Sequence, residues 1–434
     1  MHSNDRLSRR RFFGLLGASA LSVPLLDGVL RADDKKPAND RINLGFIGVG
    51  TMGRGHLDGF LGMPDVQVVA VCDVVQERRD DAKEKVEKKY ADQTKAGNYK
   101  GCKTYTDFRE LLADKGIDAV VIATPDHWHA IPCIEAARAK KDIYCEKPLT
   151  HSIVEGRHIV HEATRANIIF QVGSQQRSEF NNRFRTAVEL VRNGRIGKLK
   201  TVRVGVGGPA VPCDLKEEET PKGTDWEMWL GPAPKRGYSS VLCPKGVHKH
   251  FPAWRNYREY AGGGLADFGA HHFDIAQWAM DMDGSGPVKI EPPAKDTKGL
   301  KFTYAGGVEM IHGGEADCVF VGTDGTIFVS RGKLGVETEG NPDKLHNIVR
   351  PFTDKDWRCY PSSNHRRNWI ECIRSRKQPI CPAEVGHRTA TICHLAQIGY
   401  ELRKTLKWDP KEERFDNDEA NKRLDYQRRG DWKL

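Results

Sequence analysis

The chain of 434 residues is 38% hydrophobic, so it is long enough for two domains that each bury a core. About +3 of its formal net charge of +9 lies in residues 1–32, which hold five arginines and two aspartates. The remaining charges are mixed in sign, as in QERRDDAKEKVEKKY, so no basic stripe is present and we expect no nucleic-acid partner.

Residues 1–32 have the build of an export signal, with a cationic start, an apolar middle and a short exit. The run SRRRFF, from Ser8 to Phe13, resembles the twin-arginine export motif. Pro24 and Asp27 interrupt the apolar run before it reaches the ~20 residues that a membrane-spanning helix needs. We therefore expect export to the periplasm by the twin-arginine translocase, with residues 33–41 as a linker.

A glycine-rich turn follows the first apolar strand, INLGFIG, and leads into a helix. In this turn, GVGTMG, Gly48 permits a tight bend, Gly50 lets the backbone approach a pyrophosphate, and Gly53 allows the helix to pack closely on the strand. The helix N-terminus offers unpaired N–H donors to an anion. The pattern is typical of a dinucleotide-binding turn.

The second strand, VQVVAVC, ends at Asp73, twenty residues after the last glycine of the turn. A carboxylate at this place can accept hydrogen bonds from an adenosine ribose, which favours NAD. Arg78 and Arg79 follow closely, and either could face a 2′-phosphate, so NADP stays open.

Short apolar runs then alternate with amphipathic helices up to residue 175, which predicts an α/β Rossmann domain over residues 42–175. Ligands of such sheets bind beyond the carboxyl ends of the strands. Thr124 and Pro125 follow one strand, and Glu146 and Lys147 follow the next, DIYC. Lys147 therefore lies where the nicotinamide end of a dinucleotide would arrive. The expected cofactor-binding residues are Gly48, Gly50, Thr51, Met52, Gly53, Asp73, Thr124, Pro125, His129, Glu146, Lys147 and Gln175.

Residues 176–434 are predicted to form a second domain with strands in KLKTVRVGVG, VEMIHG and ADCVFVGTDGTIFVSRG. The last segment is expected to turn at residues 323–325 as a hairpin. Residues 207–262 form a long insertion, and loops of such length are usually functional. Its rings, Trp226, Trp229, Trp254 and Tyr257, can stack on sugar faces or only pack on one another.

The stretch ADFGAHHFDIAQWAM reads as one helix that places Asp267 and His271 one turn apart on the same face. Histidine titrates near neutrality, so His271 can take up a hydroxyl proton. A capping role for Asp267 and a packing role for His271 remain the alternative.

No metal site is predicted, because His248, His250, Asp267 and His271 lack a recognisable ligand spacing. The eleven cysteines contain no CxxC pair, so neither a disulfide framework nor a zinc site is expected.

The order of the glycine turn, Asp73, ATPDHWH, CEKPL and GGGLADFGAHHFDIAQW resembles the Gfo/Idh/MocA family of oxidoreductases. The resemblance implies a C-terminal α+β domain with a large, open, mostly antiparallel sheet, which often makes the oligomer contact, so a homodimer or homotetramer is expected. It also implies NAD(P)-dependent hydride transfer to or from a sugar or polyol, with Lys147, Asp267 and His271 as catalytic residues. The substrate-binding residues expected with them are Arg177, Trp254, Tyr257, Asp267, His271 and His272.

Two other functions remain open. Some members of the family cleave glycosides through a transient oxidation, although their Tyr-Pro-Thr-His stretch is absent from this sequence. A non-catalytic carbohydrate-binding protein is disfavoured, because each expected catalytic residue type is present. Export of an already folded chain further predicts that NAD is tightly bound, since the periplasm holds no maintained pool of the free cofactor.

Overall fold

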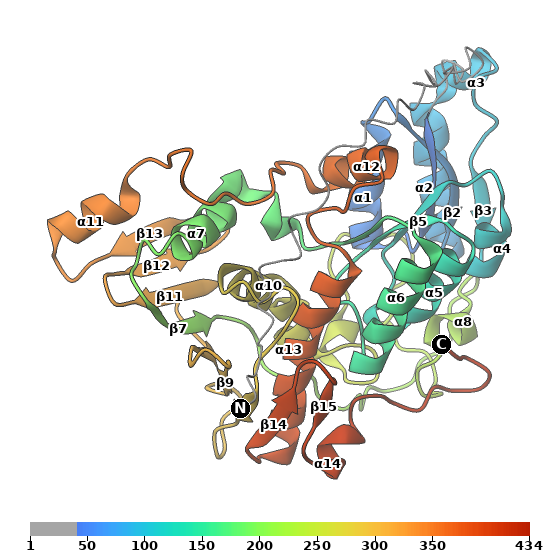
Figure 1. Ribbon diagram of the computed structural model, residues 1–434. Coiled ribbons are helices and arrows are strands. Elements are labelled where there is room, and N and C mark those ends of the chain that lie inside the picture. Colours follow the sequence, from blue (N-terminus) through green and yellow to red (C-terminus); the bar gives the residue numbers. More distant parts are fainter. Residues whose placement is uncertain (1–40) are drawn as a thin grey trace, which may run out of the picture. The chain divides into compact units, whose positions relative to one another are not determined.

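The computed structural model describes residues 41–434 (Figure 1), so the expected export signal and nearly all of the 33–41 linker lie outside the described residues. Residues 41–434 form one compact unit. Within this part of the chain, no helix is both long enough and apolar enough to cross a bilayer.

The first sheet has six parallel strands in the order β3-β2-β1-β4-β5-β6. Its central strands are rich in Val and Ile and are almost fully buried, as expected for a parallel sheet covered on both faces. The strands are β1 (Ile42–Ile47), β2 (Val66–Cys72), β3 (Lys103–Tyr105), β4 (Ala119–Ile122), β5 (Asp142–Cys145) and β6 (Phe170–Val172). The predicted Rossmann fold is confirmed.

Helices cover both faces of this sheet (Figure 1). One face packs on α1 (Thr51–Leu61), α2 (Gln76–Lys89) and α12 (His365–Ser375), and the other on α4 (Phe108–Ala113), α5 (Ala130–Arg138) and α6 (Ile153–Ala166). A short helix, α3 (Ala91–Lys95), follows α2. Helix α12 comes from far along the chain, and its Trp369 ring lies 5.6 Å from the ring of Phe60 on α1.

The second sheet has nine strands in the order β13-β12-β11-β7-β10-β9-β8-β14-β15. Strands β7 and β10 pair in parallel and the other neighbours pair antiparallel, so the prediction of a large, mostly antiparallel sheet is confirmed. The predicted hairpin joins β11 to β12. The strands are β7 (Leu199–Val204), β8 (Lys289–Glu291), β9 (Lys301–Thr303), β10 (Glu309–His312), β11 (Cys318–Gly322), β12 (Thr326–Val329), β13 (Leu334–Glu337), β14 (Leu406–Asp409) and β15 (Arg414–Phe415).

The helix predicted over residues 266–280 is two helices, α9 (Gly263–Asp267) and α10 (Gly269–Ala279), which meet at Phe268. All residues of α10 are buried, because the helix packs between the second sheet and two other helices. The remaining helices are α7 (Arg183–Arg192), α8 (Trp226–Leu230), α11 (Pro342–Val349), α13 (Ala383–Leu402) and α14 (Asp418–Asn421).

The long insertion, residues 207–262, builds a small core of its own that includes Trp226, Trp229, Leu242 and Tyr260. The rings of Trp226 and Trp229 stack on each other with 4.6 Å between their centres. The two rings thus pack on each other, and Trp229 also lines the cavity at the strand ends. The insertion also supplies residues to the cavity described next.

Candidate active site

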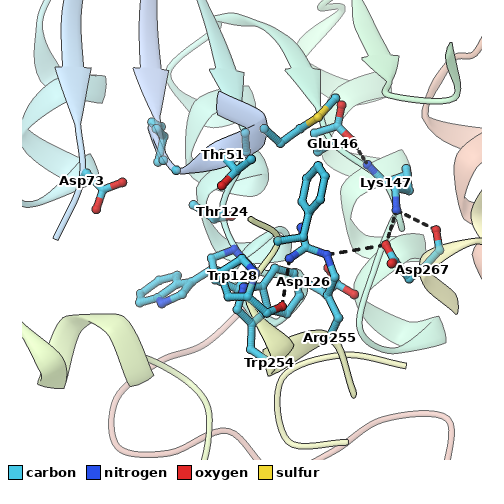
Figure 2. A pocket seen from close by; sticks show the side chains of 18 of the residues that line it. Thr51, Asp73, Thr124, Asp126, Trp128, Glu146, Lys147, Trp254, Arg255 and Asp267 are labelled. Atoms are coloured by element: carbon cyan, nitrogen blue, oxygen red, sulfur yellow. Dashed lines mark hydrogen bonds and ion pairs between the residues drawn. The ribbon is translucent and has the colours of Figure 1, made fainter. Parts of the chain in front are cut away.

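A cavity of about 510 Å³ lies at the carboxyl ends of the first sheet's strands and is lined by residues of both domains. Figure 2 shows Asp73 at one end of the cavity and the pair Lys147 and Asp267 at the other, with Thr51 and Thr124 between them. This span suits a dinucleotide that extends from its adenosine ribose to its nicotinamide.

The glycine-rich turn has the geometry that a pyrophosphate needs. Gly48 has a φ of +85°, which favours glycine. A Cβ atom on Gly53 would lie 2.1 Å from the carbonyl oxygen of Gly48, whereas one on Gly50 would meet no atom within 4 Å. The space beside Gly50 is thus left for a ligand, and no side chain caps the N-terminus of α1. These observations fit a bound dinucleotide.

The two glycines give a matched pair of variants. Gly53→Ala is expected to destabilise the fold by about 1–3 kcal/mol, because its Cβ atom collides with backbone. Gly50→Ala is expected to keep the thermal unfolding temperature of the nucleotide-free protein while it weakens dinucleotide affinity by about tenfold or more. Thermal unfolding and calorimetric titration test both variants, and equal affinity in wild type and Gly50→Ala would contradict a dinucleotide at this turn.

Asp73 is fixed by the glycine-rich turn itself. Its Oδ2 accepts a hydrogen bond from the Val49 N–H (2.9 Å) and its Oδ1 accepts one from the Val75 N–H (3.0 Å). The carboxylate lines the cavity, where it can accept further hydrogen bonds from ribose hydroxyls.

The two nearby arginines are engaged with backbone carbonyl groups. Arg78 donates to the carbonyl oxygens of Gly246 (3.1 Å) and Pro244 (2.5 Å), and Arg79 donates to that of Asp73 (2.6 Å). Arg78 is buried and bonded at two of its nitrogens, which supports NAD over NADP, whereas Arg79 is half-buried and bonded at one nitrogen among residues 41–434.

The insertion forms a roof over the adenosine end of the cavity. Met228, Trp229 and Leu242 of the insertion line the cavity together with Phe108 and Trp128 of the Rossmann domain. The insertion lies next to Asp73, where the Asp225 N–H donates to the carbonyl oxygen of Val74 (2.9 Å). The ring of Trp128 is supported by Trp432 of the C-terminal tail, 4.9 Å away. The roof is also tied to the glycine turn, where the hydroxyl of Thr51 donates to the carbonyl oxygen of His250 (2.8 Å).

Lys147 and Asp267 form the polar centre of the other end (Figure 2). The ammonium of Lys147 donates to the Asp267 Oδ1 (2.5 Å) and to the Asp267 carbonyl oxygen (2.6 Å). Arg255 Nε lies 3.7 Å from the same Oδ1. Burial alone would raise the pKa of Asp267, but the positive charges of Lys147 and Arg255 outweigh it and hold this pKa below its ordinary value.

His271 lines the same end of the cavity, and its Nδ1 is buried without a hydrogen-bond partner among residues 41–434. Burial, together with the charges of Lys147 and Arg331, lowers the pKa of His271 well below its ordinary value. The expectation that this ring titrates near neutrality is therefore wrong, and His271 is neutral at pH 7. Because Nδ1 has no partner, no hydrogen bond fixes the tautomer of the ring.

Two further carboxylates, Asp126 and Glu146, line this end. Burial raises the pKa of Asp126 to about 8, so this side chain carries a proton at neutral pH. Glu146 accepts hydrogen bonds from His56 Nε2 (2.7 Å) and Gln175 Nε2 (2.7 Å). Burial would raise the pKa of Glu146, but His56 reverses the shift and keeps this carboxylate ionised.

Most of the expected site residues line the cavity, but some lie elsewhere. Among residues 41–434, Gly53, His129, Arg177, Tyr257 and His272 do not belong to the lining. Gly53 serves the packing of the turn. Both ring nitrogens of His129 face carbonyl oxygens, those of Pro148 (2.8 Å) and Thr124 (3.0 Å). His129 therefore links the segments that follow β5 and β4.

Arg177 is 1% exposed and forms ion pairs with Asp274 and Asp283, both at 2.7 Å. Its guanidinium is buried against these two aspartates and does not line the cavity, contrary to the expected substrate contact. His272 Nδ1 lies 2.8 Å from the carbonyl oxygen of Gly205, which places this ring on the sheet side of α10.

Several lining residues were not expected from the sequence, namely Asp126, Trp128, Arg255, Phe268, Arg331 and Arg366. Asp126 and Trp128 stand in PDHWH, directly after Thr124, so that run could have signalled them. Arg331 and Arg366 lie far along the chain and carry no local signal.

Within the part of the chain that the structure describes, no group of three or more His, Cys, Asp or Glu side chains is placed to hold a metal ion. The rings of His248 and His250 lie 4.6 Å apart in the insertion, where His248 lines the cavity.

Buried histidines make stability depend on pH. His127 and His365 are 0% exposed, and burial lowers the pKa of each to about 4. The unfolded chain, with a histidine pKa of about 6.5, then binds more protons than the folded chain between about pH 6.5 and about pH 4. Each of these rings is expected to lower the free energy of unfolding by up to about 1.4 kcal/mol per pH unit as the pH falls through this window.

Denaturant titrations across the window test this expectation, and His365→Gln should reduce the change of the unfolding free energy with pH. An unfolding free energy that stays constant or rises toward pH 4 would contradict it.

Comparison with known proteins places this geometry among oxidoreductases. Residues 42–174 match the GFO/IDH/MocA model described as "Oxidoreductase family, NAD-binding Rossmann fold", and residues 210–434 match the one described as "Oxidoreductase family, C-terminal alpha/beta domain". A myo-inositol 2-dehydrogenase of Thermotoga maritima is 30% identical over 171 residues, which cover 39% of this chain and 47% of that protein. A glycosyl hydrolase family 109 protein of Shewanella pealeana is 29% identical over 212 residues, which cover 45% and 44%.

The aligned stretch thus spans less than half the length of each of these two relatives. Among solved structures, an aldose-aldose oxidoreductase from Caulobacter crescentus complexed with glycerol superposes with a TM-score of 0.55 at 16% identity, over 85% of this chain and 99% of that one. At this identity the likeness shows a shared fold.

Proposed function

Because this chain belongs to the Gfo/Idh/MocA family of oxidoreductases, we propose that it transfers a hydride between a nicotinamide dinucleotide and a secondary alcohol of a sugar, glycoside or polyol. One observation carries the proposal: the Lys147–Asp267 pair shares a single cavity with His271, Asp73 and the glycine-rich turn. The cavity thereby brings together groups that can bind a dinucleotide and groups that can take up a hydroxyl proton.

The dinucleotide, when bound, supplies the acceptor for the hydride that leaves the alcohol carbon. The residues of the chain must then stabilise the oxygen of the alcohol and remove its proton. The ammonium of Lys147, held in place by Asp267, donates to the oxygen as negative charge develops there. Neutral His271 accepts the hydroxyl proton, so that the alcohol loses one hydride and one proton and becomes a ketone.

The cofactor would be held by the glycine-rich turn at its pyrophosphate and by Asp73 at its adenosine ribose. The engagement of Arg78 supports NAD as this cofactor. Incubation of the purified protein with a panel of sugars, polyols and glycosides tests the proposal when the absorbance of reduced nicotinamide and the masses of the products are followed together. A sugar ketone that forms with reduced nicotinamide supports it, and no redox change with any compound speaks against it.

Glycoside cleavage through a transient oxidation is the second candidate. The likeness to glycosyl hydrolase family 109 proteins favours it. A ketone formed next to a C–H group makes that proton acidic, so a glycosidic bond can be eliminated before the hydride returns. In the same panel, a cleaved glycoside without net cofactor reduction would identify this reaction.

We also propose that NAD is bound as a prosthetic group. The roof of Met228, Trp229 and Leu242 supports this, because the insertion is hydrogen-bonded to the backbone just after Asp73 and to Thr51 of the glycine-rich turn. If the chain is exported to the periplasm by the twin-arginine translocase, it can carry such a cofactor across. Denaturation of periplasmic protein and quantification of the released nucleotide tests the idea, and empty protein that is active only with added NAD would contradict it.

A homodimer or homotetramer, joined through the outer face of the nine-stranded sheet, is the proposed assembly. Light scattering during size-exclusion chromatography measures it, and a monomer at micromolar concentration would contradict it.

A further inference from the structure

Arg331 lines the cavity from the turn between β12 and β13. Two hydrogen bonds set its direction: its Nε donates to the Gln176 Oε1 (3.0 Å), and its backbone N–H donates to the Asp317 Oδ2 (3.2 Å). The guanidinium carbon lies 4.9 Å from the ring centre of Phe180 and 5.4 Å from that of Phe268. The aromatic rings and Gln176 thus hold the planar group in one orientation.

This guanidinium has no counter-ion among the residues that the structure describes. Within residues 41–434, no carboxylate oxygen lies within 4.0 Å of its nitrogens, and its two terminal nitrogens donate to no acceptor. Arg177, in contrast, is satisfied by Asp274 and Asp283. Arg331 is half-buried and packs on two aromatic rings, so its charge is partly shielded from water, and an anion that arrives with a ligand could pair with it.

Arg331 lies close to the reacting groups. The ring of Phe268 lies near both Arg331 and His271. Its centre is 5.4 Å from the Arg331 guanidinium carbon and 6.5 Å from the ring centre of His271. The charge of Arg331 also contributes to the lowered pKa values of Asp267 and His271. A sugar ring with its oxidised carbon at Lys147 and His271 could therefore present a substituent to Arg331.

We propose that the substrate is a sugar acid, a uronate or an aldonate, free or within a glycoside, whose carboxylate binds the terminal nitrogens of Arg331. This inference rests on the function proposed above and narrows its substrate class. A carboxylate is planar and singly charged, so it matches one guanidinium edge with two parallel hydrogen bonds. A phosphate ester carries nearly two charges and calls for a second cation beside Arg331. Of the other cations that line the cavity, Lys147 and Arg255 are shared with Asp267, and Arg366 lies beside His56.

The test compares acid and neutral sugars on the cofactor-loaded protein. The probes are D-glucuronate, D-galacturonate and D-gluconate, the neutral sugars D-glucose and D-galactose, and D-glucose 6-phosphate. Calorimetric binding and the absorbance of reduced nicotinamide are both measured for wild type, Arg331→Met and Arg331→Lys. We expect at least one acid to bind wild type about tenfold to hundredfold more tightly than its neutral counterpart, which corresponds to one charged hydrogen-bonded pair.

Arg331→Met is expected to lose this preference, measured as the ratio of acid affinity to neutral-sugar affinity within the same variant. Arg331→Lys should keep only part of the preference, because lysine retains the charge but cannot form two parallel hydrogen bonds to a carboxylate. Equal binding of acids and neutral sugars by wild type would overturn the inference, and so would a preference for the phosphate ester or an acid preference that survives in Arg331→Met.

Neutral sugars that are oxidised without any acid preference would leave the proposed function standing. Tight acid binding without hydride transfer would contradict that function and not the role of Arg331. Far-ultraviolet circular dichroism and the thermal unfolding temperature establish that the variants are folded.

Discussion

Replacement of Lys147 by alanine is expected to lower kcat by at least about 100-fold, the usual cost of losing a donor to a developing oxyanion. The ammonium of Lys147 is fixed 2.5 Å from the Asp267 Oδ1 and lines the cavity where the alcohol oxygen would lie. Dinucleotide affinity should change little, because the glycine-rich turn and Asp73 lie at the other end of the cavity. Steady-state turnover and calorimetric titration with NAD measure the two effects separately.

Two controls separate the charge of Lys147 from its packing. Added ethylamine should restore part of the rate of Lys147→Ala, since it can place an ammonium in the vacated space. Asp267→Asn should give a smaller loss than Lys147→Ala, because the Asp267 carbonyl oxygen still accepts from Lys147 at 2.6 Å. Near-normal turnover of Lys147→Ala would remove this residue from the chemistry.

Replacement of His271 by alanine is expected to lower kcat by about 100-fold or more, which is typical of a lost general base. Since the pKa of His271 is well below its ordinary value, the wild-type rate should show no His271-dependent step near neutral pH. The group expected to titrate in the measured range is Asp126, whose pKa is raised to about 8. Above that pH the carboxylate of Asp126 is ionised and can accept the proton that His271 has taken from the hydroxyl, so the rate of oxidation should rise through about pH 8.

The pH profiles of wild type and two variants distinguish these roles. The rise near pH 8 should persist in His271→Ala at a lower overall rate, and it should vanish in Asp126→Asn. The amide introduced by the second substitution keeps the shape of the side chain without its titration. If His271→Ala turned over at the wild-type rate, His271 would be a packing residue and the proton would have to leave by another group.

The features that the sequence predicted well are local ones. The glycine-rich turn, Asp73 and Lys147 each follow a strand directly, and the sheet topology brings such strand ends to one edge. Asp267 and His271 are four residues apart, and both line the cavity although the chain bends between α9 and α10. By contrast, β3 was not predicted, because its three residues are largely exposed and show no apolar pattern.

What the sequence could not predict depends on contacts between distant segments. Arg177 was expected to bind substrate, but two aspartates from the region of α10 neutralise it, and nothing in the sequence sets that distance. Arg331 shows the reverse, since an arginine in an ordinary hairpin turn reaches the cavity only because the second sheet packs beside α10. The titration of His271 was misjudged for the same reason, because both its burial and the nearby charges come from tertiary packing.

A single-turnover experiment shows whether this cavity oxidises an alcohol by hydride transfer to a bound nicotinamide. Protein loaded with one equivalent of NAD is mixed rapidly with excess sugar acid, and with excess glycoside in a parallel experiment, while the absorbance of reduced nicotinamide is recorded. We expect the absorbance to rise toward one reduced nicotinamide per protein, a rise that persists for a dehydrogenase and decays when transient oxidation returns the hydride. Conversion of the substrate without any reduced nicotinamide at any time would contradict it.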